Sequence, residues 1–385
     1  MIKYPHTISS KLPEVGTTIF TKMSALANQY GAINLSQGFP DFPIDERLID
    51  LVHQRMLDGF NQYAPMQGAL ALREVISTKL KDSYGVEYCP NEEITVTAGA
   101  TEAIYSAIAA FVKEDDEVVV FTPAYDCYVP AIKVHGGNPV YIQMHAPDYR
   151  IDWDHVKKLV NVRTRMILIN TPHNPTGSIL QKEDLLELEK IVAGKEIVVI
   201  SDEVYEHIIY DGQLHESACK FPELRKQTLS VFSFGKTFHV TGWKLGYIVG
   251  PEKLMSEFRK VHQFNVFSCN HPFQLAIADY MQDAQTYGGV SEFYEHKRNK
   301  FLQAIEGSRF KPLTSSGTYF QLLSFEGITH EGDVEFAERM TKEYGLASIP
   351  VSVFYNSKLD EKVLRFCFAK QDETLERAGE ILKRI

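Results

Sequence analysis

The sequence has few cysteines and tryptophans and no long apolar run. Its five cysteines are scattered over 385 residues without C-x-x-C spacing, which argues against a zinc site or a disulfide framework and indicates reduced thiols. No stretch approaches the ~18 apolar residues of a membrane-spanning helix, and Met1–Leu12 show no signal-peptide pattern. We therefore expect no metal, no membrane segment and a cytoplasmic location.

Positively charged residues are fewer than negatively charged ones. Forty Lys and Arg residues stand against 50 Asp and Glu residues, which gives a formal net charge of -10. A negative surface without basic runs repels nucleic acids and anionic membranes, so we expect neither as a partner. Small anions can still be bound where individual cations face a cavity.

Short apolar runs alternate with longer helical patterns, which is typical of an α/β fold with a mostly parallel, doubly wound sheet. The chain is too long for one ordinary core. We predict a large domain over 41–280 and a smaller α+β domain over 281–385, joined by an N-terminal arm over 1–40 whose turn-rich end (34–43) is too irregular for either sheet. The predicted strands of the large domain are Ile94–Thr97, Glu117–Phe121, Met166–Asn170, Ile197–Ser201, Leu229–Phe232 and Tyr247–Val249. For the small domain we predict helices at 293–306, 334–344 and from 373, and strands at 318–323 and 362–368.

Lys236 lies on a bend next to Gly235, directly after an apolar run. The same segment contains the hydroxyls of Ser233 and Thr241 and a second cation, Lys244, which are groups suited to binding a phosphate ester. An amine nucleophile beside an anion site predicts pyridoxal phosphate as the cofactor.

Ligands of open α/β sheets bind beyond the carboxyl ends of the strands, so the residues after each run are the candidates for a binding site. Gly99, Ala100 and Thr101 follow the first run and begin a helical pattern. The free N–H groups of such a helix start, with the Thr101 hydroxyl, form a phosphate cradle. The alternative is an ordinary threonine cap.

The third and fourth runs are followed by polar side chains that suit the ring of the cofactor. Asn174 lies in N-T-P-H-N-P-T-G, where its bond to Pro175 is a candidate for the cis isomer and its amide could donate to a phenolate oxygen. Asp202 could pair with a pyridinium N–H, and Tyr205 could reach the phenolate oxygen. The alternatives are a plain turn for Asn174 and a helix N-cap for Asp202.

Together, S-F-G-K-T-F-H-V-T-G-W-K, N-P-T-G, S-D-E-V-Y and R-F-C-F resemble the class I, fold-type I aminotransferases that use pyridoxal phosphate. T-T-I-F-T-K-M-S-A-L-A, I-N-L-S-Q-G-F-P-D-F and N-Q-Y-A-P-M-Q-G resemble the branch of bacterial methionine aminotransferases and kynurenine/glutamine transaminases. The resemblance implies a ping-pong transfer of the amino group from methionine, aromatic or glutamine-like amino acids to a 2-oxo acid.

The resemblance also implies a role for each matching residue. Lys236 would be the Schiff-base lysine and would move the α-proton, Asp202 would pair with the pyridine nitrogen, and Asn174 and Tyr205 would contact the ring oxygen. Tyr125 would stack on the ring. Tyr63 would reach the phosphate of a neighbouring subunit, which implies a homodimer. The phosphate would be held by Gly99, Ala100, Thr101, Ser233 and Lys244.

Arg365 lies in the apolar run V-L-R-F-C-F, where its planar guanidinium suits a substrate α-carboxylate, unless it is a solvated edge residue. The resemblance favours the carboxylate, with help from Asn174 and the Gly38 N–H. It also suggests an apolar side-chain pocket formed by Phe20, Tyr63, Tyr125, Phe39 and Phe354.

Two other functions use the same motifs. A carbon–sulfur β-lyase would use the same lysine and aspartate to eliminate a leaving group from a cysteine conjugate. A regulator that only binds pyridoxal phosphate would carry a basic DNA-binding extension, for which motifs that begin within the first 20 residues leave no room.

Overall fold

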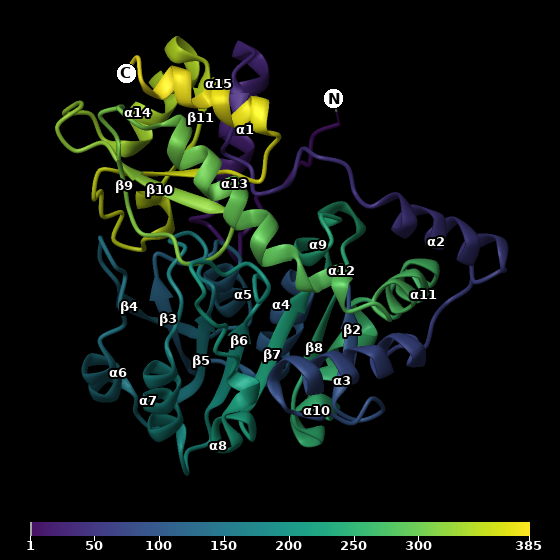
Figure 1. Cartoon of the computed structure of the whole chain (residues 1–385). Coiled ribbons are helices and arrows are strands. Elements are labelled where there is room, and N and C mark those ends of the chain that lie inside the picture. The colour runs from purple at the N-terminus through teal and green to yellow at the C-terminus, as the bar shows by residue number, and fades with distance from the viewer. Residues whose placement is uncertain (1) are drawn as a thin grey trace.

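The computed structural model describes residues 2–385, and a seven-stranded sheet forms its centre (Figure 1). The strand order is β2-β8-β7-β6-β5-β3-β4. Among these strands only β8 runs antiparallel to its neighbours, so the predicted α/β fold with a mostly parallel sheet is confirmed. The strands are β2 (Ile94–Thr97), β3 (Glu117–Thr122), β4 (Asn138–Gln143), β5 (Thr164–Asn170), β6 (Val198–Asp202), β7 (Thr228–Ser233) and β8 (Gly246–Val249).

Helices cover both faces of this sheet because its strands are apolar on both sides. In β3, Val118 and Val120 belong to the core formed with α4, α5 and α10, whereas Val119 and Phe121 belong to the core formed with α6, α7 and α8. The period of two along a strand produces this division. The covering helices are α3 (Leu70–Tyr84), α4 (Ala100–Phe111), α5 (Tyr128–Val134), α6 (Trp153–Leu159), α7 (Lys182–Val192), α8 (Pro222–Arg225), α10 (Glu252–Asn265) and α11 (His271–Tyr280). Helix α2 (Glu46–Leu57) packs on α11.

Strand β4 was not predicted from the sequence. Among the described strands it pairs with β3 alone, and it forms one edge of the sheet. Its second residue is Pro139, and both of its end residues, Asn138 and Gln143, are exposed. An edge strand tolerates proline and polar residues because one side needs no ladder hydrogen bonds, so its sequence lacks the apolar run that marks the inner strands.

A second layer of smaller elements lies above the carboxyl ends of β5, β6 and β7 (Figure 1). It contains a four-stranded sheet in the order β12-β13-β10-β9 and a parallel pair, β1 with β11. The strands are β1 (Ile33–Asn34), β9 (Lys311–Pro312), β10 (Phe320–Ser324), β11 (Leu346–Ala347), β12 (Ile349–Pro350) and β13 (Val363–Cys367). The helices are α1 (Ile19–Tyr30), α13 (Val290–Ala304), α14 (Asp333–Arg339), which continues as a π-helical turn to Tyr344, and α15 (Asp372–Leu382). The short helix α12 (Gln285–Gly288), just before α13, packs Tyr287 on the core of the large sheet instead.

The N-terminal arm is built into this second layer. Met23 of α1 and Leu35 lie in the same core cluster as the aromatic residues of β10 and β13. The segment that begins at Asn34 lies outside the two larger sheets, although Asn34 itself pairs with Ala347 in the short parallel sheet. The domain boundaries near 41 and 280 remain a prediction.

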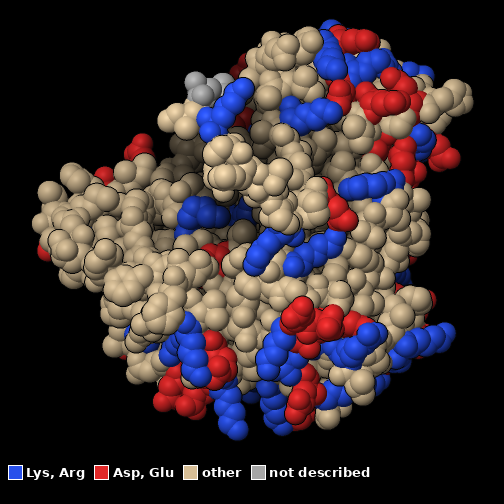
Figure 2. Space-filling model, turned by 180° about the vertical axis from the view of Figure 1, so that it is seen from behind, with Lys and Arg blue, Asp and Glu red and all other residues tan. Residues whose placement is uncertain are grey.

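The opposite face of the molecule has a hollow between the upper and lower parts, and Lys or Arg atoms lie inside it (Figure 2). No helix in residues 2–385 is both long and apolar enough to cross a membrane. The same residues contain no group of three or more His, Cys, Asp or Glu side chains placed to hold a metal ion.

Candidate active site

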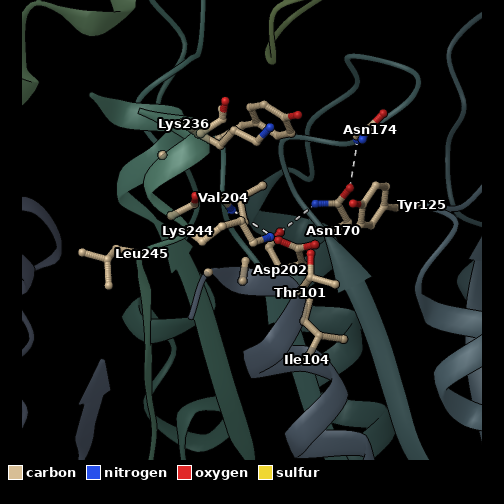
Figure 3. Close-up of a pocket in the computed structure, with 16 residues that line it drawn as sticks. Thr101, Ile104, Tyr125, Asn170, Asn174, Asp202, Val204, Lys236, Lys244 and Leu245 are labelled. Carbon is tan, nitrogen blue, oxygen red and sulfur yellow. Dashed lines mark hydrogen bonds between the residues drawn. The ribbon is translucent and has the colours of Figure 1, made fainter. Parts of the chain in front are cut away.

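A cavity of about 180 Å³ lies at the carboxyl ends of the central strands, where α4 and the loops after β5, β6 and β7 meet (Figure 3). Most of the side chains predicted to bind a cofactor line it, although they come from segments far apart in the sequence. These are Gly99, Ala100, Thr101, Tyr125, Asn174, Asp202, Tyr205, Ser233, Lys236 and Lys244. The parallel strands bring most of them together because these residues end a strand or follow its end, whereas Lys244 lies just before β8.

Lys236 is presented on α9 (Phe234–Thr237), a single helical turn that follows β7 directly. Its Nζ donates to the Tyr319 hydroxyl at 2.8 Å and lies 3.4 Å from the Gly38 carbonyl oxygen. Burial lowers the pKa of this amine to about 8, and the nearby cations Lys244 and Arg365 act in the same direction. A larger fraction of Lys236 is therefore the neutral, nucleophilic amine near neutral pH.

Asp202 ends β6 on the opposite side of the cavity from Lys236 and is 4% exposed. Tyr128 donates its hydroxyl to Oδ2 at 2.5 Å, and the Val204 N–H lies 3.4 Å from Oδ1. Burial raises the pKa of this carboxyl to about 6, which the hydrogen bond from Tyr128 partly offsets. No cationic side chain in residues 2–385 donates a hydrogen bond to this buried carboxylate, which therefore suits a positively charged group of a ligand.

The loop after β5 is held by two asparagines. Asn170 donates its amide N–H to the Asp202 carbonyl oxygen at 2.8 Å and accepts the Asn174 backbone N–H at 2.9 Å (Figure 3). The Asn174–Pro175 peptide bond is cis. Asn170 is a site residue that was not predicted from the sequence, although its place at the end of β5 is the signal that could have identified it.

The start of α4 forms an anion cradle. Gly99 precedes this 12-residue helix with φ +78°, a conformation that favours glycine. A Cβ built on Gly99 would lie 3.4 Å from the Lys244 Nζ, so the ammonium group lies beside the helix start. Free backbone N–H groups, the positive end of the helix dipole and a lysine thus face the same end of the cavity.

Two tyrosines border the cavity from other sides. Tyr125 lines it and also borders a second, larger cavity. Tyr205 is buried, its ring lies 5.1 Å from that of Tyr319, and the Lys236 Nζ lies 5.6 Å from its ring centre. Burial raises the pKa of both phenols, so both remain neutral hydrogen-bond donors.

Arg365 lies on β13 above the cavity and is 1% exposed. Its guanidinium donates to Asn174 Oδ1 at 2.6 Å and to the Ser36 carbonyl oxygen at 3.2 Å, while the buried Nε has no hydrogen-bond partner in residues 2–385. Nor does any acidic side chain of the described chain form a salt bridge with it. Since a buried, unpaired guanidinium is costly, this arrangement favours an anionic ligand, and the alternative of a solvated edge residue is wrong.

Aromatic rings surround Arg365. Its guanidinium carbon lies 3.9 Å from the Phe320 ring centre and 5.3 Å from the centres of Phe20 and Phe354. Phe20, Phe354 and Tyr125 also border the second cavity, of about 950 Å³, which opens between α5 and the N-terminal arm.

Three predicted residues are placed differently from the rest. Tyr63 is 79% exposed and packs its ring against Phe267, so it does not contribute to the cavity of its own chain. Gly38 presents its carbonyl oxygen to Lys236 and to the Tyr319 hydroxyl, and the role of its N–H remains a prediction. Phe39 is 46% exposed and borders neither cavity.

The chain is similar to known aminotransferases in both sequence and structure. Residues 30–382 match the family described as aminotransferase class I and II. The chain is 46% identical to the methionine aminotransferase of Escherichia coli K12 over the full length of both proteins. It is 32% identical to human kynurenine–oxoglutarate transaminase 3, over 98% of this chain and 90% of the relative. A solved structure of an E. coli protein with a methionine aminotransferase function superposes with a TM-score of 0.97 at 46% identity, covering 99% of this chain and 100% of that one.

Proposed function

Because this chain belongs to the class I and II aminotransferases, we propose that it binds pyridoxal phosphate through Lys236 and uses methionine or a similar apolar amino acid as the amino donor. The observation that carries the proposal is Arg365, which is buried, lacks an anionic partner in residues 2–385 and is surrounded by aromatic rings next to the Lys236 cavity.

The residues of the cavity fit this cofactor. The Gly99–Thr101 cradle with Ser233 and Lys244 suits a phosphate at one end. Asp202 suits a protonated ring nitrogen, and Asn174 and Tyr205 suit the ring oxygen, while Tyr125 is available for stacking. When bound, pyridoxal phosphate supplies an electron sink that stabilises negative charge at the substrate α-carbon.

The protein's own groups supply binding and proton transfer. Lys236 Nζ, whose lowered pKa increases the fraction of neutral amine, takes the proton from the substrate α-carbon. The Tyr319 hydroxyl and the Gly38 carbonyl hold that amine in position. Asp202 stays ionised opposite a positive ring nitrogen, because an opposite charge offsets the cost of its burial.

Arg365 binds the α-carboxylate of the substrate. Its Nε is free to donate, and its terminal nitrogens already point toward Asn174 and the arm residue Ser36. A carboxylate that accepts from this buried guanidinium forms charge-assisted hydrogen bonds, which are about twice as strong as neutral ones. This contact also orients the α-carbon toward Lys236.

The substrate side chain enters the second cavity beside Phe20 and Phe354. No arginine in residues 2–385 lines this cavity to bind a distal carboxylate. Four lysines border the cavity: Lys22 pairs with Glu338 and Lys133 with Glu14, whereas Lys11 and Lys358 form no salt bridge within residues 2–385. The rings of Phe20 and Phe354 are the contacts that favour an uncharged, apolar side chain such as that of methionine.

The exposure of Tyr63 supports a homodimer. A tyrosine that is 79% exposed and does not reach the cavity of its own chain is available to the cavity of a second copy. We propose that Tyr63 contacts the phosphate bound by the neighbouring subunit, and that residues 41–280 and the remainder of the chain act as two domains around each site.

A donor scan tests the proposed substrate class. Protein loaded with pyridoxal phosphate is mixed singly with methionine, phenylalanine, glutamine and aspartate, and the loss of its visible absorbance is followed. We expect methionine to react about tenfold or more faster than aspartate, because apolar contacts differ by ~1–3 kcal/mol between such side chains. Equal rates with aspartate would contradict the apolar pocket. Release of ammonia and pyruvate from a cysteine conjugate without a 2-oxo acid would instead indicate a β-lyase.

Substitution of Arg365 by alanine should raise KM for every amino acid by a similar factor, about a hundredfold, since all share the α-carboxylate and lose a buried charge pair worth ~2–5 kcal/mol. Arg377→Ala, at an exposed position in α15, is the matched control and should leave KM unchanged. Steady-state kinetics with three donors measures the effect. An increase confined to one donor would mean that Arg365 recognises the side chain instead.

A further inference from the structure

The first turn of α4 carries an acidic residue next to the anion cradle. Glu102 follows Thr101 directly, and its carboxylate accepts the Ala98 N–H at 3.2 Å and the Ser106 hydroxyl at 2.6 Å. These contacts tie the segment before α4 to the helix itself, because Ala98 precedes the helix and Ser106 lies within it. A negative charge at this place opposes the binding of a phosphate by the same helix end, so the charge of Glu102 needs compensation.

His262 of α10 provides a partner for that charge. It is fully buried, its Nδ1 lies 3.0 Å from Glu102 Oε1, and its Nε2 lies 3.2 Å from the Met66 carbonyl oxygen. The ring also stacks on Phe258 with 5.5 Å between centres. A histidine buried between two oxygen atoms is oriented by both of them.

The neighbours of Glu102 and His262 fix two of the hydrogen atoms in this cluster. Ser106 Oγ already accepts the Asn265 amide at 3.0 Å, so the Ser106 proton points to Glu102, which also accepts the Ala98 N–H. The Met66 carbonyl cannot donate, so His262 Nε2 carries the hydrogen of that contact. A second hydrogen on Nδ1 would point at Glu102 Oε1 and make the ring an imidazolium, the form in which it balances the charge of Glu102.

We infer that His262 neutralises Glu102 and thereby keeps the start of α4 selective for a phosphate group. The carboxylate is needed to hold the Ala98 N–H at the helix start, and the imidazolium removes its repulsion toward a bound phosphate. Lys244 and the helix N–H groups then act on the anion without opposition. His262 is a positioning and charge-balancing residue that need not touch the ligand. The inference rests on the proposed function, because it takes the phosphate to be that of pyridoxal phosphate.

Binding of two ligands that differ only in the phosphate tests this inference. Pyridoxal phosphate and pyridoxal are titrated into cofactor-free wild-type protein, H262Q, E102Q and E102Q/H262Q, and binding is followed by absorbance and fluorescence. In H262Q the uncompensated charge of Glu102 should lower the affinity for pyridoxal phosphate by about tenfold or more. The affinity for pyridoxal should change by less than about threefold. E102Q should bind pyridoxal phosphate at least as well as the wild type, and the double variant should return to within about threefold of it.

The comparison between ligands separates charge compensation from a purely structural role. Equal weakening of both ligands in H262Q, or no change at all, would overturn the inference. If H262Q does not fold, the double variant still tests the inference. A ratio of pyridoxal phosphate affinity to pyridoxal affinity that is tenfold lower in the double variant than in the wild type would also overturn it. Wild-type protein that binds neither ligand would contradict the proposed function itself.

Discussion

Replacement of Lys236 by alanine is expected to abolish turnover and the visible absorbance that pyridoxal phosphate shows when it is bound covalently. Besides Lys236, only Lys244 places an amine among the described residues that line the cavity, and Lys244 lies at the anion cradle rather than opposite Asp202. Loss of Lys236 removes both the covalent attachment and the base for the α-proton. We expect kcat to fall by about a thousandfold or more.

Reductive trapping makes this prediction specific to one residue. Borohydride treatment followed by peptide mass spectrometry should locate the cofactor mass on the peptide that contains Lys236. Lys244→Ala should weaken cofactor affinity yet leave the label on Lys236, and Lys113→Ala, at an exposed position, should change neither. Normal absorbance and turnover in the Lys236→Ala protein would show that another amine binds the cofactor.

The inner strands of the large sheet could be predicted because each is a short apolar run buried on both faces. Val118 and Val120 pack on one side and Val119 and Phe121 on the other, so the whole run must be apolar. Strand β4 could not be predicted in this way. Its residues are half-buried and include Pro139. Its pairing with β3, rather than an apolar run of its own, makes this segment a strand.

The cavity could be anticipated for a related reason. Asp202 ends one parallel strand, Asn174 and Lys236 follow the ends of two others, and those ends meet at one edge of the sheet. The side chains that hydrogen-bond to these residues could not be predicted from the sequence. Tyr128 and Tyr319 reach Asp202 and Lys236 from 74 and 83 residues away, and no local pattern marks either contact. His262 and Glu102 are likewise 160 residues apart and meet only through the packing of α10 on α4.

Substitution of Asp202 by asparagine is expected to reduce kcat about a hundredfold or more while leaving the fold intact. Asparagine has nearly the same shape and can still accept the Tyr128 hydroxyl, but it carries no negative charge to stabilise a protonated ring nitrogen. Removal of one preorganised electrostatic contact at a reacting group commonly costs ~10²–10³ in kcat. Single-turnover kinetics with methionine measures the loss, and thermal unfolding checks the fold.

Two further variants test whether the loss of kcat arises from the charge of Asp202. Tyr128→Phe removes the hydrogen bond at 2.5 Å but keeps the carboxylate, so we expect a loss of about tenfold, consistent with a hydrogen bond to a charged group worth ~1.5–3 kcal/mol. Glu203→Gln, one residue along the chain, alters a buried carboxylate that pairs with His215 and lies outside the cavity. Its kcat should remain near that of the wild type. Wild-type turnover in the Asp202→Asn protein would mean that the ring nitrogen is not held by this carboxylate and that the electron sink does not depend on its charge.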